Sequence, residues 1–203
     1  MLTVTMSGMN NSGIDIVCYK LSSIVCCQLD LFVRRSAQLD YQKRNIIVPL
    51  LKSLIKHHYE IIQLAQTLNE LLSPIALIQC VSSGLAICFV GFQLMIAVQP
   101  GSPEFISQVA YFGSMFSQIF FYCWYGQSII LKSISISPSH YSTNWYDAYP
   151  SNIRSYLFLI MERTKRPLIL RAGGVFPLSL STLMSILRSS YSYMAVLQRL
   201  NRQ

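Results

Sequence analysis

Long uncharged stretches dominate the pattern of hydrophobic and polar positions along this chain. No charged residue occurs between Glu70 and Glu104, and none occurs between Glu104 and Lys132. A helix needs about 20 consecutive, mostly apolar residues to cross the hydrocarbon core of a bilayer. Both stretches are longer than that. The pattern therefore predicts an all-α fold: a polytopic transmembrane helical bundle with cytoplasmic helical extensions.

The pattern predicts about four membrane spans. They comprise residues 14–33, 74–98, 105–127 and 175–198. The first span contains Asp15, Lys20 and Asp30, and the last contains Arg188. Ionisable groups within a span usually face a protein interior or an aqueous cavity. We therefore expect these four side chains to lie inside the bundle or along a water path.

Composition agrees with a membrane protein. Hydrophobic residues make up 52% of the chain and charged residues only 12%, whereas soluble domains carry about 25% charged residues. The net charge of +8 does not indicate nucleic acid, because the basic residues gather in two connections between spans. These are Arg34, Arg35, Lys43, Arg44, Lys52 and Lys56, and then Lys132, Arg154, Arg163, Lys165 and Arg166.

The positive-inside rule converts that asymmetry into a topology. Segments 34–73 and 128–174 are predicted to be cytoplasmic, whereas 1–13, the short turn 99–104 and 199–203 are predicted to lie outside the cell. Arg199 and Arg202 depart mildly from the rule. The glycosylation sequon at Asn10 falls on the side that the charges independently predict to be external.

The first cytoplasmic segment shows helical periodicity. Leu54, Ile61 and Leu68 recur every seven residues, and Leu50, Leu64 and Leu71 lie beside them. Such a stripe predicts an amphipathic helix that extends the membrane helices. His57 and His58 lie on it without a second ligand pair at helical spacing. We therefore expect a solvated or partner-facing role for them and no metal site.

The second cytoplasmic segment divides in two. Ser133–Tyr149 is rich in Ser and Tyr and is predicted to be a loop. Ser151 is a plausible N-cap for a helix that runs through Arg163. Pro167 and the pair Gly173-Gly174 then interrupt the chain before the last span.

Polar residues follow one face of the last span. They are Ser181, Ser185, Arg188, Ser192 and Arg199, spaced by three, four or seven residues. One interpretation is that the serines satisfy local backbone or interhelical hydrogen bonds. The alternative is a water-lined channel face, which Arg188 favours because a charge within the membrane needs water or a partner.

Several sequence stretches resemble the C-terminal half of insect odorant receptors. They are LLKSLIKHHYEIIQLAQTLNELLSPIALIQCVSSGLAIC, FYCWYGQSI, NWY and RPLILRAGG…PLSLSTLMSILRSSYSYMAVL, in the family's order and spacing. The resemblance implies an odorant-gated, non-selective cation channel without a cofactor. It also implies a hetero-tetramer with a shared co-receptor in the plasma membrane of olfactory sensory neurons.

The resemblance also implies site residues. Val196 and Leu200 match the family's hydrophobic gate, and Arg188 falls where many members carry Lys. Ser185 and Ser192 would face the pore. Tyr111, Ser114 and Gln118 are candidates for contact with the odorant, although aromatic residues in a span are more often packing residues.

The family's first three spans have no counterpart here. We therefore expect a truncated receptor subunit, and the alternative is a truncated subunit that does not sense odorants and only assembles with, or modulates, the co-receptor channel. Other classes fit less well. No catalytic constellation supports an enzyme, a G-protein-coupled receptor would place its C-terminus inside, and a secondary transporter would show repeated halves.

Overall fold

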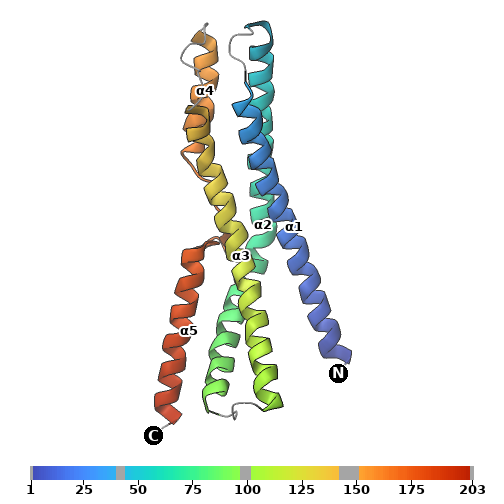
Figure 1. Cartoon of the computed structure of the whole chain (residues 1–203), viewed down its shortest axis with the longest axis vertical. Helices are drawn as coiled ribbons and strands as arrows, with labels where there is room; N and C mark the ends of the chain where they lie inside the picture. Colours follow the sequence, from blue (N-terminus) through green and yellow to red (C-terminus); the bar gives the residue numbers. More distant parts are fainter. Residues whose placement is uncertain (1, 40–43, 97–101, 142–150, 202–203) are drawn as a thin grey trace. The chain divides into compact units, whose positions relative to one another are not determined.

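The chain folds almost entirely into helices, as predicted. The computed structural model describes residues 2–39, 44–96, 102–141 and 151–201. In chain order the elements are α1 (Leu2–Ala37), α2 (Arg44–Ile96), α3 (Pro103–Tyr141), α4 (Ser151–Thr164), β1 (Arg171–Ala172), β2 (Phe176–Pro177) and α5 (Leu180–Asn201) (Figure 1). The all-α transmembrane bundle is confirmed.

Contacts within the chain divide it into two compact units. The α5 unit comprises Met1–Asp15, Leu71–Gln127 and Arg171–Gln203. The α4 unit comprises Ile16–Glu70 and Ser128–Leu170. The α5 unit therefore holds the greater part of three predicted spans, and the α4 unit holds the greater part of both predicted cytoplasmic segments and of the first span.

Two stretches of the described helices are long and apolar enough to cross a membrane. They are Gly13–Ala37 in α1 and Ile47–Leu94 in α2. They include most of the first two predicted spans. Helices α3 and α5 carry more Ser, Gln and Tyr, which lower their hydropathy, and they are not in this set. The bounds of all four spans, and the outside and cytoplasmic sides, stay predictions.

The core of the α4 unit includes one stripe of α2. Leu54, Ile61 and Leu68 are buried, as the seven-residue repeat predicts. The neighbouring positions Leu50, Leu64 and Leu71 are exposed instead. The buried stripe is completed by Leu51, His58, Ile62 and Ala65. The amphipathic helix is therefore confirmed, but its apolar face is narrower than the leucines alone suggest.

The predicted loop at Ser133–Tyr149 is wrong over its first nine residues. Helix α3 continues through Tyr141 and contains Pro138. Ile136 is fully buried, and the Ser133 hydroxyl donates to the Ile130 carbonyl at 2.8 Å and accepts from the Leu168 N–H at 3.1 Å. These contacts retain the helix despite its polar composition. Residues 142–150 lie outside the described part.

Helix α4 confirms the predicted helix from Ser151, but the last helix begins later than predicted. Val175 lies in a turn, Phe176–Pro177 pairs with Arg171–Ala172 as a short antiparallel hairpin, and α5 starts at Leu180. Ser179 caps it, because its hydroxyl accepts from the Thr182 N–H at 3.4 Å.

The two glycines of this hairpin have a structural reason. Gly173 and Gly174 have φ angles of 59° and 71°, a left-handed conformation that glycine adopts without steric cost. The Gly173 N–H donates to the Ser73 carbonyl at 2.9 Å, and the Gly174 N–H donates to the Ser73 hydroxyl at 3.1 Å. The predicted interruption at this pair is therefore a turn, and its two N–H groups bond the hairpin to α2.

Candidate pore and ligand-binding sites

Helix α5 has one face that packs and an opposite face that is exposed. Leu183, Ser190 and Met194 are buried in the α5 unit. Ser181, Ser185, Arg188 and Ser192 are all exposed. At 3.6 residues per turn these four lie on the side of α5 opposite the buried stripe. Arg188 and Ser192 thus point away from the packed interior of the unit, whereas Ser185, at the edge of this face, also lines a cavity between α2 and α5.

Small residues of α2 receive the buried face of α5. The Ser190 hydroxyl donates to the Gly84 carbonyl at 3.1 Å. A Cβ on Gly84 would lie 3.4 Å from Ile186 Cγ2, and one on Gly91 would lie 2.9 Å from Met194 Sδ. Of the serines that the sequence placed on the polar face, Ser185 donates to the Ser181 carbonyl at 3.0 Å, so the interpretation as a local backbone partner holds for Ser185. Ser189 also donates to a carbonyl one turn earlier in α5.

The predicted gate residues lie toward the C-terminal end of α5. The side chain of Val196 is 53% exposed. Leu200 belongs to the same helix, but its side chain lies outside the described part. Arg188 forms no ion pair within the described part of the chain. The pore and gate roles stay predictions.

The three candidate odorant contacts lie on α3, and neither of two cavities found among the described residues is lined by all three. Gln118 is half-buried, and its Oε1 accepts from Gln79 Nε2 of α2 at 2.8 Å. Tyr111 lines a recess of about 430 Å³ beside Phe89 and Gln93. Ser114 is exposed. Asn10 lies in α1, and its side chain lies outside the described part.

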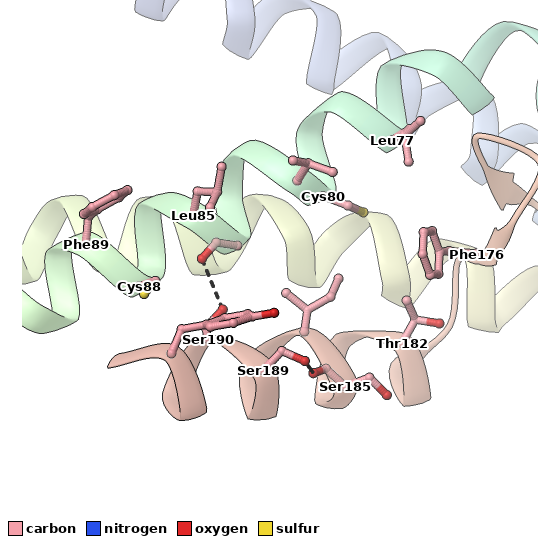
Figure 2. A pocket seen from close by; sticks show the side chains of 14 residues that line it. Leu77, Cys80, Leu85, Cys88, Phe89, Phe176, Thr182, Ser185, Ser189 and Ser190 are labelled. Atoms are coloured by element: carbon pink, nitrogen blue, oxygen red, sulfur yellow. Dashed lines mark hydrogen bonds between the residues drawn. The ribbon is translucent and has the colours of Figure 1, made fainter. Parts of the chain in front are cut away.

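The larger cavity, which the sequence did not indicate, lies between α2 and α5. It has a volume of about 600 Å³. Figure 2 shows side chains of both helices and of Phe176 around it. Its lining residues are Leu77, Cys80, Val81, Gly84, Leu85, Cys88, Phe89, Phe176, Thr182, Ser185, Ile186, Ser189, Ser190 and Tyr193. Its small lining residues include Gly84 on α2 and Ser185 and Ser189 on α5, about a hundred positions apart, so spacing within one helix could not have located it.

A buried polar contact explains one charge in the first predicted span. The Tyr122 hydroxyl donates to Asp15 Oδ1 at 2.9 Å, and both residues are buried. The second oxygen of Asp15 has no hydrogen-bond partner among the described residues. Asp15 therefore faces the protein interior, as expected for an ionisable group in a span.

Asp30 of the first predicted span forms an ion pair with Lys132 of the second predicted cytoplasmic segment, within the α4 unit. Lys132 Nζ donates to Asp30 Oδ2, and the side chains are 34% and 49% exposed. A pair at this exposure is screened by solvent and contributes on the order of 1 kcal/mol.

We expect Asp30→Asn and Lys132→Met each to lower the free energy of unfolding of the detergent-solubilised chain by about 1 kcal/mol. The exchange Asp30→Lys with Lys132→Asp should recover most of the loss. Glu60→Gln is the control, because Glu60 and Lys56 are 57% and 80% exposed and 4.0 Å apart. Thermal melting measures all four variants. If the double variant melts at no higher temperature than the two single variants, the pairing of Asp30 with Lys132 is contradicted.

The expectation of a solvated or partner-facing role is wrong for His58. This residue, on the predicted cytoplasmic segment 34–73, is buried, and its ring stacks on Phe32 with centroids 4.9 Å apart. Its position continues the buried stripe of α2. His57 Nε2 lies 3.1 Å from Gln28 Oε1. Burial, together with the nearby Arg163 and His57 charges, lowers the pKa of His58 to about 4.

This lowered pKa predicts a loss of stability in acid. The unfolded chain binds a proton at His58 near pH 6.5, and the folded chain does so only near pH 4, so stability falls as pH drops between these values. At pH 5 the loss is about 2 kcal/mol. Burial and Arg35 also lower the pKa of His57, while Glu60 acts in the opposite sense.

Melting temperatures of the wild type and of His58→Gln, measured in detergent from pH 7.5 to 5, test this prediction. The variant should show a flatter dependence, and His57→Gln should show a smaller change. Parallel curves for the wild type and His58→Gln would exclude the effect.

No group of three His, Cys, Asp or Glu side chains lies close enough to hold a metal ion within the described residues. None of the six cysteines forms a disulfide; five of them are buried, whereas Cys27 is exposed. The arrangement offers a polar helix face, an apolar cavity and buried hydrogen bonds. It defines a transmembrane helical bundle.

Comparison with known proteins identifies the family. The family described as 7tm Odorant receptor matches residues 1–191. The chain is 29% identical over 199 residues to Odorant receptor 94a of Drosophila melanogaster, which covers 97% of this chain and 51% of that protein. It is 32% identical over 149 residues to Odorant receptor Or2 of Anopheles gambiae, which covers 73% of this chain and 39% of that protein.

Solved structures agree in fold. The insect olfactory receptor OR5 of Machilis hrabei in complex with eugenol superposes with a TM-score of 0.80 at 20% identity, over 92% of this chain and 47% of that one. The structure of the same receptor described without eugenol gives a TM-score of 0.75 at 17% identity. The chain belongs to the odorant receptor family, and it spans about half the length of the relatives it matches.

Proposed function

We propose that this chain acts as an odorant receptor subunit in which α5 lines the pore of a ligand-gated, non-selective cation channel. The shared co-receptor completes a hetero-tetramer in the plasma membrane of olfactory sensory neurons. The observation that carries the proposal is the orientation of α5. Its face with Ser185, Arg188 and Ser192 is exposed, and the opposite stripe packs on α2.

The chemistry of this face suits an aqueous path. Serine hydroxyls and a guanidinium are costly against lipid but are solvated by water in a pore. Val196, one turn beyond Ser192, presents an apolar side chain that is 53% exposed. A ring of such side chains closes a pore by excluding water.

Cysteine accessibility tests this role. We expect co-expression with the co-receptor in oocytes to give odorant-evoked current, and a cationic methanethiosulfonate reagent to block it in Ser192→Cys. Ser190→Cys is the matched control, because Ser190 is 5% exposed and faces Gly84. Equal block of both variants, or of neither, would contradict a pore-lining face at Ser192.

The second candidate function is a subunit that assembles without sensing odorants. It is favoured by the separation of Tyr111, Ser114 and Gln118, which do not share a cavity within the described part of the chain. Co-expression separates the two functions. Odorant-evoked current supports the receptor, whereas reduced co-receptor current without an odorant response supports the modulator.

A further inference from the structure

A buried polar side chain joins α3 to α2 in the α5 unit. Gln79 on α2 is 9% exposed. Its Nε2 donates to Gln118 Oε1 of α3 at 2.8 Å and to the Ser83 hydroxyl of α2 at 3.3 Å. An amide nitrogen carries two hydrogens, so these two bonds commit both. Gln79 therefore bonds a predicted odorant contact with one hydrogen and the next turn of its own helix with the other.

The turn of α2 that Gln79 reaches is also a turn on which α5 packs. Ser83 is fully buried. The carbonyl of the next residue, Gly84, accepts from the Ser190 hydroxyl of α5 at 3.1 Å, which is the dashed line between α2 and Ser190 in Figure 2. Ser190 itself is 5% exposed. Gln118, Gln79 and this contact thus form a continuous path of buried polar groups from α3 through α2 to α5.

We propose that Gln79 is a positioning residue that couples the side chain of Gln118 to the packing of α5 on α2. A buried N–H group that loses its acceptor is destabilising, so a ligand or a substitution that withdraws the Gln118 oxygen makes the Gln79 amide turn. The bond to Ser83 then shifts, and the turn of α2 that holds Ser190 moves with it. The effect of this coupling on gating rests on the function proposed above, because only there does α5 line a pore.

The reactivity of a native thiol tests this coupling without any change at the contact between α2 and α5. Cys88 lies one turn beyond Gly84 on α2, lines the cavity between α2 and α5 and is 8% exposed. Its alkylation by N-ethylmaleimide, followed by mass spectrometry of the whole chain in cell membranes, therefore reports on separation of the two helices. Cys26 of the α4 unit is 7% exposed. It serves as the reference, because general unfolding would expose both thiols.

We expect Gln79→Leu and Gln118→Leu each to raise the alkylation rate of Cys88 about threefold to tenfold, the effect of one interhelical hydrogen bond in a bilayer. The rate at Cys26 should not change. The double variant should react no faster than Gln79→Leu, which already removes the bond that Gln118→Leu breaks. Gln118→Glu keeps an acceptor oxygen and should stay near the wild-type rate. Gln93→Leu is the matched control, because Gln93 is an exposed glutamine of the same helix.

A Cys88 rate that Gln118→Leu leaves at the wild-type value would overturn the coupling. Equal increases at Cys88 and Cys26, or additive effects of the two substitutions, would overturn it as well.

Currents separate this inference from the channel function. In oocytes that also express the co-receptor, Gln79→Leu should shift the half-maximal odorant concentration at least about threefold. An unchanged concentration would overturn the role of Gln79 in gating. A wild-type chain that gives no odorant-evoked current would contradict the proposed channel instead, and the Cys88 rates would still decide whether Gln79 couples α3 to α5.

Discussion

Replacing Gly126 with alanine is expected to disrupt the packing of α3 against the residues that precede α5. A Cβ at this position would lie 2.2 Å from the carbonyl oxygen and 2.9 Å from the carbonyl carbon of Leu178. These are backbone atoms of a residue that is 1% exposed, so they cannot rotate away as a side chain would. Overpacking of this kind costs about 3 kcal/mol, the upper part of its usual range.

Gly113→Ala provides the matched control on the same helix. No atom lies within 4 Å of a Cβ at Gly113, and alanine favours helix over glycine by about 1 kcal/mol. We expect Gly126→Ala to lower both surface expression and the melting temperature of the detergent-solubilised chain, while Gly113→Ala leaves them equal or higher. Equal melting of the two variants would show that α3 does not approach Leu178 this closely.

Periodic features of this fold could be predicted from sequence, because periodicity is a local property. The repeat of Leu54, Ile61 and Leu68 correctly located the buried side of α2, and the serine spacing correctly grouped one face of α5. The pair Gly173-Gly174 correctly marked a break before the last helix. Each of these depends on spacing within a single element.

Features that depend on distant contacts could not be predicted. Ser133–Tyr141 has a loop-like composition, yet it stays helical where Ile136 is buried and Ser133 bonds to Leu168. His58 is buried because Phe32 of α1 stacks on it, 26 positions away in the sequence. The sequence shows that a polar residue occurs there, but not what covers it.

The candidate sites divide in the same way. The exposed face of α5 could be predicted, since it follows one helix. The contact between Asp15 and Tyr122 and the cavity between α2 and α5 join positions separated by about a hundred residues. Only the tertiary structure brings these residues together, and single-chain periodicity carries no signal for them.

In the proposed channel, neutralising Arg188 is expected to raise the permeability to divalent cations. Arg188 lies on the exposed polar face of α5 and has no ion-pair partner within the described part of the chain. At about 6 Å in water, Coulomb's law gives a repulsion of about 0.7 kcal/mol for a monovalent cation and about 1.4 kcal/mol for a divalent one. The difference corresponds to about a threefold discrimination against the divalent ion.

Reversal potentials of odorant-evoked currents under bi-ionic calcium and sodium conditions measure this effect in oocytes that also express the co-receptor. Arg188→Gln should raise the calcium-to-sodium permeability ratio about threefold. Arg188→Lys keeps the charge and should leave the ratio near the wild-type value. Met184→Gln, at a residue 62% exposed and one helical turn before Arg188, changes polarity without changing charge. The repulsion depends on charge rather than on side-chain size. A change of the permeability ratio in Arg188→Lys or in Met184→Gln would therefore contradict a charge effect at Arg188.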